Sequence, residues 1–200
     1  ILSIAGNPTL YRAARRFASG GTKVAAAPAG PRPEIDPNHC VLVGYGPVGR
    51  IVYRLLADRG ASVTVIDLNL RTVRMLKAQG IAALYGDVLR PGTLKDAGIA
   101  RAGSLILSAD IEDAAEVVRQ ARMRNPGLRV FARCTHLRDA AALQRAGASM
   151  VAAGEAEVGV ALVEAMTAER AGEGGTKVDP RDAIRARLYD TGSSDSRPTA

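Results

Sequence analysis

The 200-residue sequence contains no tryptophan, and its two phenylalanines and five tyrosines leave it with few aromatic side chains. Proteins that hold single-stranded nucleic acid stack the bases on aromatic rings. The formal net charge of +7 is spread over expected helix faces and tails and is not concentrated in one block. Nucleic-acid-binding proteins usually carry a clustered basic patch instead. The composition therefore argues against nucleic acid as the partner.

Cysteine and histidine are also scarce. The two cysteines, Cys40 and Cys134, lie in or beside expected strands, and neither belongs to a C-x-x-C motif. We interpret them as small buried residues of a protein in a reducing compartment, and a disulfide framework is not supported. The two histidines, His39 and His136, have no second ligand at helical spacing, so no metal site is expected. Neither forms, with a cysteine or serine, a pattern that indicates nucleophilic catalysis.

No apolar run reaches the length of a membrane span, and no signal-peptide pattern is visible. Residues 1–20 begin apolar and turn basic, as the cytoplasmic end of a transmembrane helix does. A short amphipathic helix or a flexible leader fits them as well. Residues 21–37, rich in Gly, Ala and Pro, are expected to form a linker. Residues 172–200, rich in Gly, Ser and charge, are expected to be a disordered tail, which leaves residues 38–171 as the folded domain.

The most informative motif lies between His39 and Arg50. It reads as a buried strand, Val41 to Val43, followed by the run Gly-Tyr-Gly-Pro-Val-Gly and then a helix. A G-x-G-x-x-G pattern is weak evidence alone, but a strand before it, a helix after it and an acid about twenty residues later indicate a nucleotide-binding fingerprint. That acid is Asp67, directly after the strand Ser62 to Ile66. The competing interpretation is an ordinary glycine-rich turn between a strand and a helix.

Each residue type in this turn has an expected role. Gly44 permits the tight turn, Gly46 lets the backbone approach a pyrophosphate, and Gly49 lets the helix lie close to the sheet. Pro47 fits the first helical turn, where its missing N–H costs nothing. The amides of Val48 and Gly49, together with the helix dipole, then face the phosphate.

The remaining sequence alternates between strands and helices. Further strands are expected at residues 82–85, 104–108, 129–134 and 149–153, and further helices at residues 70–80, 92–97, 114–123, 137–146 and 155–170. Short apolar strands that alternate with helices predict a parallel sheet covered on both faces. With right-handed crossovers and the fingerprint, the sequence predicts a Rossmann-like, doubly wound α/β sheet of six strands in the order 3-2-1-4-5-6.

In such a sheet, ligands bind beyond the carboxyl ends of the strands next to strand 1. The candidate nucleotide contacts are Gly44, Tyr45, Gly46, Pro47, Val48, Gly49, Asp67, Leu68, Asp87, Val88, Ser108, Ala109, Asp110 and Arg133. A carboxylate at Asp67 favours a free ribose 2′-hydroxyl and repels the 2′-phosphate of NADP, but it fits NAD and AMP alike. Asp87 is either a contact to the adenine end or the cap of the following helix. Arg133 is either a phosphate contact or part of a salt bridge.

The motifs GYGPVG, VIDLN, LYGDV, LILSAD, VFARC and LQRAGAS, in this order over residues 38–170, resemble the RCK N-terminal domain of potassium channels and transporters. This domain is also called KTN or TrkA-N. The leader LSIAGNPTLYR resembles the end of the last membrane helix of Kef-type monovalent cation:proton antiporters of the CPA2 family. The glutathione-gated Kef members carry a basic residue at the fourth position of the fingerprint. In this sequence that position is Pro47, and Arg50 follows one turn later. The sequence therefore leaves open whether glutathione or another ligand regulates this domain.

The resemblance implies a regulatory domain that binds NAD(H) or an adenine nucleotide (AMP, ADP or ATP) and gates a potassium or other monovalent cation:proton antiporter. The domain would lie at the cytoplasmic face of the inner membrane, joined to the transmembrane domain of the same polypeptide. It would form a homodimer, with Val158, Leu162 and Met166 as candidate contacts, although this stripe would also suit packing on its own sheet.

We expect this domain to sense a nucleotide and not to act as an enzyme. Two other classes of protein remain possible. The first is a free-standing NAD-dependent oxidoreductase, which the sequence disfavours because it offers no second domain for a substrate and no catalytic Tyr-Lys or His-acid set. The second is a separate regulatory subunit of a potassium channel or transporter, which the apolar leader disfavours.

Overall fold

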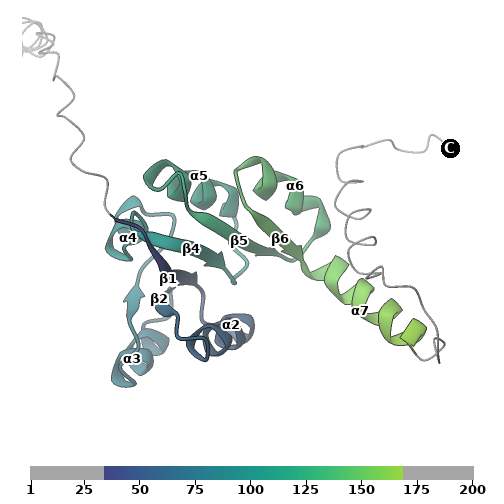
Figure 1. Cartoon of the computed structure of the whole chain (residues 1–200), viewed down its shortest axis with the longest axis horizontal. Helices are drawn as coiled ribbons and strands as arrows, with labels where there is room; N and C mark the ends of the chain where they lie inside the picture. Colours follow the sequence, from purple (N-terminus) through teal and green to yellow (C-terminus); the bar gives the residue numbers. More distant parts are fainter. Residues whose placement is uncertain (1–33, 169–200) are drawn as a thin grey trace, which may run out of the picture. The chain divides into compact units, whose positions relative to one another are not determined.

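The computed structural model describes residues 34–168 (Figure 1), so the expected end of a membrane helix, most of the linker and the tail lie outside the described residues. The strands are β1 (Asp36–Val43), β2 (Ser62–Asp67), β3 (Ala83–Tyr85), β4 (Ala102–Leu107), β5 (Arg129–Cys134) and β6 (Met150–Ala153). The helices are α2 (Pro47–Ala57), α3 (Leu70–Ala78), α4 (Pro91–Asp96), α5 (Ala114–Arg124), α6 (Leu137–Arg145) and α7 (Gly154–Ala168).

The six strands form one parallel sheet in the order β3-β2-β1-β4-β5-β6, which confirms the predicted fold class. β1 lies at its centre, where Val41 pairs with Thr64 of β2 on one side and with Leu105 of β4 on the other. The direction in which the strands are added reverses between β1 and β4. The carboxyl ends of these two strands therefore mark the switch point at which such sheets bind ligands.

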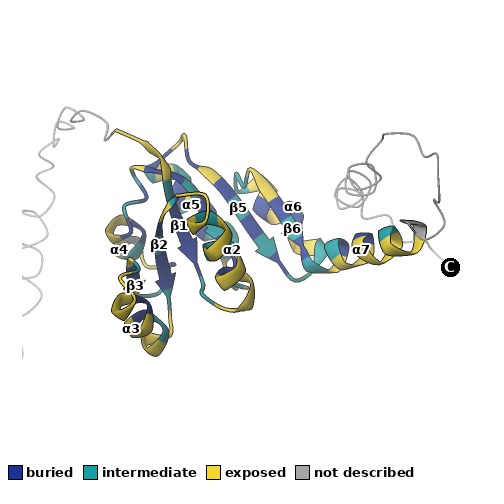
Figure 2. Cartoon of the chain, turned by 60° about the horizontal axis from the view of Figure 1, so that its bottom comes forward, coloured by how far each residue is buried: buried dark blue, intermediate teal, exposed yellow. Residues whose placement is uncertain are grey.

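Helices cover both faces of the sheet, and β1 contributes to both cores. Val41 and Val43 belong to a cluster that includes side chains of α4, α5 and α6. Cys40 and Leu42 belong to a second cluster, with side chains of α2 and α3. Successive side chains of a strand point to opposite faces, so a strand buried on both sides is apolar throughout. In Figure 2 the central strands are correspondingly coloured as buried.

β1 starts at Asp36, within the segment expected to be linker and before the expected start at Val41. The backbone N–H of Asp36 donates a hydrogen bond to the carbonyl oxygen of Arg101 at 2.8 Å. A Cβ atom on Gly103 would lie 2.6 Å from the carbonyl oxygen of Pro37, so the chain can follow β4 here because position 103 has no side chain. The extension is set by tertiary pairing with β4. Pro37 conceals it in the sequence, because proline cannot donate a ladder hydrogen bond and is unusual within a strand.

α7 leaves the β6 edge of the sheet with most of its apolar side chains uncovered (Figure 2). Val158, Leu162 and Met166 are 60%, 67% and 52% exposed, whereas Ala156 and Val160 are buried. The interpretation that the stripe packs on its own sheet is therefore wrong for the described residues. This leaves the apolar stripe open to another surface.

Cys40 and Cys134 are both buried and free, as expected. Burial raises the pKa of both thiols above the usual value for cysteine. Within residues 34–168, no three His, Cys, Asp or Glu side chains are grouped to hold a metal ion. None of the helices in the described part is both long and apolar enough to cross a membrane.

Candidate nucleotide-binding site

The chain leaves β1 through a tight turn at Gly44, whose φ of +88° lies in the left-handed region that disfavours other residues. A Cβ atom at this position would also lie 2.6 Å from the Cβ atom of Ala109. A Cβ atom on Gly49 would lie 2.1 Å from the carbonyl oxygen of Gly44. Both positions therefore need glycine for the turn and α2 to lie so close together.

Gly46 differs from its two neighbours in the motif because it faces open space. No heavy atom lies within 4 Å of the position that its Cβ atom would occupy. Gly46 is the N-cap of α2, and no side chain caps this helix end. The first amides of a helix lack intrahelical acceptors, so those of Val48 and Gly49 are available to an anion.

The carboxylate of Asp67 reaches from the end of β2 to the glycine turn. Its Oδ2 atom accepts a hydrogen bond from the backbone N–H of Tyr45 at 2.7 Å, and Oδ1 accepts one from Asn69 at 2.7 Å. A carboxylate has about four acceptor sites, so this group can hold the turn and still accept a hydrogen bond from a ribose hydroxyl. Sequence reasoning missed the first of these roles.

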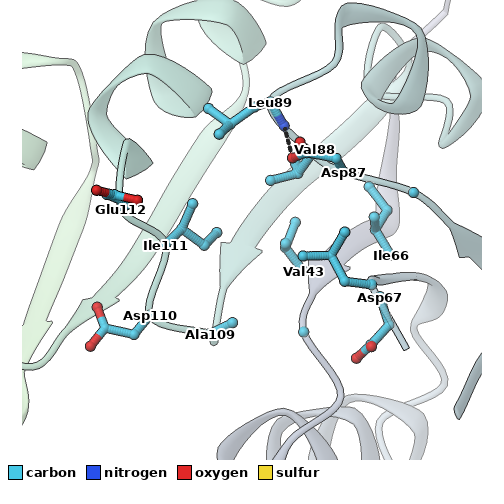
Figure 3. A pocket seen from close by; sticks show the side chains of 13 residues that line it. Val43, Ile66, Asp67, Asp87, Val88, Leu89, Ala109, Asp110, Ile111 and Glu112 are labelled. Carbon is cyan, nitrogen blue, oxygen red and sulfur yellow. Dashed lines mark hydrogen bonds between the residues drawn. The ribbon is translucent and has the colours of Figure 1, made fainter. Parts of the chain in front are cut away.

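A cavity of about 340 Å³ opens beyond the carboxyl ends of β1, β2, β3 and β4 (Figure 3). Its lining residues are Val43, Gly44, Ile66, Asp67, Leu68, Gly86, Asp87, Val88, Leu89, Ala109, Asp110, Ile111 and Glu112. Figure 3 shows apolar side chains around the centre of the cavity and carboxylates toward its rim. The volume falls within the range of small-molecule sites, which are mostly apolar with a few polar groups.

Seven of the predicted contacts line this cavity: Gly44, Asp67, Leu68, Asp87, Val88, Ala109 and Asp110. The other lining residues were not among the predicted contacts: Val43, Ile66, Gly86, Leu89, Ile111 and Glu112. Each lies within two residues of a predicted strand-end contact, and that position was the only signal, because hydropathy does not show which way a side chain at a strand end or in a loop points.

The structure places Ser108 beneath the glycine turn and not on the cavity. Its side chain is buried, and its Oγ atom lies 2.9 Å from the carbonyl oxygens of both Val43 and Gly44. The hydroxyl group therefore donates to the backbone of the turn. Ser108 supports the site from below, and β4 thereby helps to set the shape of the turn that follows β1.

Asp87 caps a turn and not a helix. Its Oδ1 atom accepts a hydrogen bond from the backbone N–H of Leu89 at 2.9 Å. The next helix, α4, starts at Pro91 with Arg90 as its N-cap, and this helix end has no side-chain cap. The helix-cap interpretation is therefore wrong, whereas contact with the adenine end stays a prediction that the cavity-lining position permits.

Arg133 lies outside the cavity. It lines a neighbouring cavity of about 240 Å³, which shares Asp110, Ile111 and Glu112 with the first. Its strand, β5, is separated from the glycine turn by β4. Within the part of the chain that the structure describes, Arg133 forms none of the ion pairs within 4.0 Å, so the salt-bridge interpretation has no support.

Contacts connect the cavity to the start of α7. The hydroxyl group of Thr135 donates to the carboxylate of Asp110, and the carbonyl oxygen of Thr135 accepts a hydrogen bond from the N–H of Glu155 at 3.3 Å. The carboxylate of Glu155 lies 2.7 Å from Nδ1 of His136 and accepts a hydrogen bond from the N–H of Leu137 at 3.0 Å. The hydrogen bond from His136 is the main cause that lowers the pKa of Glu155.

A doubly wound parallel sheet, a glycine turn at its switch point and a carboxylate at the end of β2 define a nucleotide-binding domain of the Rossmann class. The TrkA-N domain family matches residues 40–153, and this chain belongs to that family. The predicted membership in the RCK N-terminal domains is thereby confirmed.

Among curated proteins, the chain is 31% identical over 137 residues to "Putative cation/proton antiporter YbaL" of Escherichia coli (strain K12). The match covers 68% of this chain and 25% of YbaL, so the chain spans about a quarter of the length of that relative. The crystal structure of the TrkA-N domain of E. coli YbaL, an inner membrane protein, superposes with a TM-score of 0.62 at 30% identity. It covers 64% of this chain and 96% of that domain.

Two further solved structures are informative about ligands. The Kef CTD of Shewanella denitrificans, in its AMP-bound form, has a TM-score of 0.60 at 25% identity over 78% of this chain and 98% of the other. The GsuK channel bound to NAD has a TM-score of 0.52 at 22% identity over 71% of this chain and 25% of the channel, which shows a common fold. AMP and NAD are thus ligands of related structures, in agreement with the predicted cofactors.

Proposed function

We propose that this chain is the nucleotide-sensing regulatory domain of a monovalent cation:proton antiporter. It acts at the cytoplasmic face of the inner membrane, with the transmembrane domain in the same polypeptide. The observation that carries the proposal is the cavity beside Asp67 and the glycine turn, in a chain of the TrkA-N family. The likeness to YbaL and to the AMP-bound Kef domain supports the link to an antiporter.

The cavity suggests how an adenine nucleotide binds. The ribose hydroxyls donate to Asp67, and the first phosphate accepts hydrogen bonds from the amides at the start of α2, next to Gly46. The base then lies between the apolar side chains of Val88 and Ile111, within reach of the Asp87 carboxylate. Tyr45, Pro47 and Ser108 set the shape of the turn, and Arg133 remains one strand away.

The side chains of the cavity support binding and not catalysis. The lining contains carboxylates and apolar groups, but it contains no histidine, cysteine, lysine or hydroxyl side chain. Hydride transfer to a substrate requires groups that orient the substrate and exchange its proton. The lining of this cavity supplies only carboxylates, three of which already accept hydrogen bonds from neighbouring groups.

A sensor must pass the state of its site to another part of the protein. The contact from Asp110 to Thr135, and from Thr135 to the first turn of α7, is the proposed route. A nucleotide that displaces the Asp110 carboxylate would weaken its bond to Thr135 and alter the base of α7. This mechanism requires that the nucleotide bind the two states of the domain with different affinities.

The exposed stripe of α7 supports a homodimer. Val158, Leu162 and Met166 are each more than half exposed in the isolated chain, together with Val163 at 44%. Contiguous apolar surface of this kind usually marks an interface. Since α7 is also the end of the proposed route from the cavity, a change at its base would reach the partner subunit.

The decisive experiment measures cation–proton exchange by the full-length antiporter in vesicles, with and without nucleotide. Wild type should respond to AMP or NAD, and Asp67→Ala should exchange ions without that response. Thr135→Val, which keeps the side-chain volume but removes the hydroxyl group, should still bind nucleotide and respond less. A wild-type response in Asp67→Ala would refute this site as the switch. Turnover of NADH by the 200-residue chain at enzyme-like rates would instead support the oxidoreductase alternative.

A further inference from the structure

Four arginines lie where the amino ends of β5 and β6 meet the helices that precede them. They are Arg122 and Arg124 in the last turn of α5, Arg129 at the start of β5, and Arg145 at the end of α6. Parallel strands have their amino ends at one edge of the sheet. The four residues, which we call the arginine corner, are therefore at the end of the sheet opposite to the nucleotide cavity.

Hydrogen bonds from Arg122 join the two loops of the corner. Its Nε atom donates to the carbonyl oxygen of Gly147, and its Nη1 atom donates to that of Pro126, both at 3.0 Å. Since Gly147 precedes β6 and Pro126 precedes β5, one guanidinium group ties both loops together. Arg124 donates to the carbonyl oxygen of Gln120 at 2.9 Å. Both arginines are thus held by neutral acceptors and keep their full positive charge.

The sequence around the corner lacks acidic residues. It has no Asp or Glu in residues 117–138 or in residues 140–154. Among the ion pairs within 4.0 Å in the described part of the chain, none involves an arginine of the corner. By contrast, Arg101, at the same end of the sheet, lines a hollow with Glu34 and Asp36. The positive charge of the corner is therefore concentrated and not balanced by neighbouring acids.

Exposed apolar side chains lie beside these arginines. Met123, between Arg122 and Arg124 on α5, is 72% exposed, and Ile35, just before β1, is 46% exposed. A Cβ atom on Gly127 would lie 3.7 Å from Cδ1 of Ile35, so the segment that leads into β1 lies against the loop before β5. The polypeptide therefore enters the folded domain next to the corner.

We propose that the arginine corner binds the anionic lipid headgroups of the membrane that holds the transporter. This inference rests on the proposed function, which puts a transmembrane domain in the same polypeptide. The cytoplasmic leaflet carries a negative surface potential, and arginine binds phosphate through charge-assisted hydrogen bonds. Exposed apolar side chains such as Met123 and Ile35 suit a lipid interface better than the surface of a nucleic acid. The nucleotide cavity, at the other ends of the strands, then faces the cytosol.

The test measures cosedimentation of the 200-residue chain with lipid vesicles at about 0.1 M salt. Wild type should bind vesicles that contain phosphatidylglycerol but not vesicles of phosphatidylcholine alone, and added salt should weaken the binding. Arg129→Gln/Arg145→Gln, which removes two exposed charges, should lower the partition coefficient by about tenfold or more. Arg145→Gln alone should lower it by about fivefold, since each basic residue near an anionic surface contributes about that factor.

Two further variants separate charge at the corner from other causes. Arg74→Gln/Lys77→Gln makes the same change in charge at exposed positions of α3, which packs on β2 and β3 at the other edge of the sheet. It should change the partition coefficient by less than about twofold, because it lies beyond the screening length from the corner. Arg129→Lys/Arg145→Lys keeps both charges and should stay within about threefold of wild type. Thermal unfolding without vesicles checks that each variant folds.

Three results would overturn the inference. The first is equal binding of wild type to vesicles with and without phosphatidylglycerol. The second is equal partition coefficients for the Arg129→Gln/Arg145→Gln and Arg74→Gln/Lys77→Gln variants, because net charge or residues 1–33 would then explain the binding. The third is binding to double-stranded DNA that Arg129→Gln/Arg145→Gln weakens while binding to vesicles is unchanged, which would assign the corner to nucleic acid.

The nucleotide site is tested separately, by calorimetric titration of the same chain with AMP and NAD. Arg129→Gln/Arg145→Gln should bind AMP like wild type, because neither residue lines the cavity. Failure of wild type to bind AMP and NAD would remove the proposed nucleotide-sensing function, whatever the vesicles show. Failure to bind vesicles, with AMP binding intact, would remove only the lipid contact.

Discussion

The backbone N–H of Tyr45 donates a hydrogen bond to the Oδ2 atom of Asp67 at 2.7 Å, across 22 residues of sequence. This bond joins the glycine turn after β1 to the carboxylate at the end of β2, the two parts of the nucleotide fingerprint. The acid that the sequence pattern assigns to the ribose therefore also helps to hold the phosphate-binding turn. We therefore expect changes at Asp67 to affect both the stability of the fold and the affinity for nucleotide.

Asp67→Ala leaves the N–H groups of Tyr45 and Asn69 without their acceptor. We expect the free energy of unfolding to fall by about 1–3 kcal/mol without ligand, because the half-buried N–H of Tyr45 loses its partner. Nucleotide affinity should fall by about one to two orders of magnitude. Urea unfolding and calorimetry measure the two effects, and the exposed Asp96→Ala serves as the control. Unchanged stability of Asp67→Ala would show that this carboxylate does not hold the turn.

Alanine substitutions at two glycines of the fingerprint should have different effects on stability and on nucleotide binding. Gly46→Ala should leave the free energy of unfolding within about 0.5 kcal/mol of wild type, because its Cβ atom meets nothing. It should abolish nucleotide binding, because the methyl group occupies the path of the phosphate. Gly49→Ala should lower stability by about 1–3 kcal/mol or more, because its Cβ atom meets the carbonyl oxygen of Gly44.

Thermal unfolding with and without AMP measures both effects, with Gly92→Ala as the control. Gly92 also faces open space, but it lies in α4 and does not line the cavity. Normal AMP binding by Gly46→Ala would mean that the phosphate does not approach this part of the turn.

The exposed stripe of α7 predicts self-association. We expect the chain to sediment as a dimer at tens of micromolar, and Leu162→Asp to be monomeric, because a charge in an apolar interface is costly. Met123→Asp on α5 is the matched control: Met123 is 72% exposed but lies outside the stripe. A wild-type monomer, or equal effects of both substitutions, would contradict the α7 interface.

The contact between Glu155 and His136 predicts a pH dependence. The pKa of Glu155 is lowered from 4.5, chiefly by the hydrogen bond from His136. A carboxyl group whose pKa is lowered in the folded state stabilises the fold at pH values above its ordinary, unfolded-state pKa. This contribution is lost as the pH falls through the lowered, folded-state pKa. Glu155→Gln should therefore lower the free energy of unfolding at neutral pH and have little effect on it in acid.

Chemical unfolding from neutral pH to about pH 3 measures the effect of Glu155→Gln. His136→Ala provides the control, because Glu155→Gln should cost less in that background. If Glu155→Gln lowered the free energy of unfolding equally at every pH, in the wild type and in His136→Ala, the contact between Glu155 and His136 would not be the cause.

Burial predicts that both thiols are unreactive. The pKa of Cys40 and of Cys134 is raised chiefly by desolvation, so both stay protonated at mildly alkaline pH, where a free thiol reacts as the thiolate. A thiol reagent at about pH 8 should label neither cysteine in the folded chain and both after denaturation. Rapid labelling of either one before unfolding would contradict its buried position.

The sequence by itself determined the order of strands and helices, the Rossmann class, the glycine turn and the acid at Asp67. These features depend on local causes that a sequence displays directly. The apolar run from Cys40 to Val43, bounded at once by the glycine turn, favours a strand buried on both sides. The spacing of Gly44, Gly46 and Gly49 reflects the backbone of one turn.

Only the tertiary structure decided which side chains meet. It paired Asp36 with β4, turned Ser108 toward the glycine turn, and put Arg133 one strand away from the cavity. It also left the stripe of α7 uncovered and brought Glu112 to the rim of the cavity. The physical reason is that these arrangements depend on the register between strands distant in sequence. Periodicity records the face on which a side chain lies, but not the neighbour it finds there.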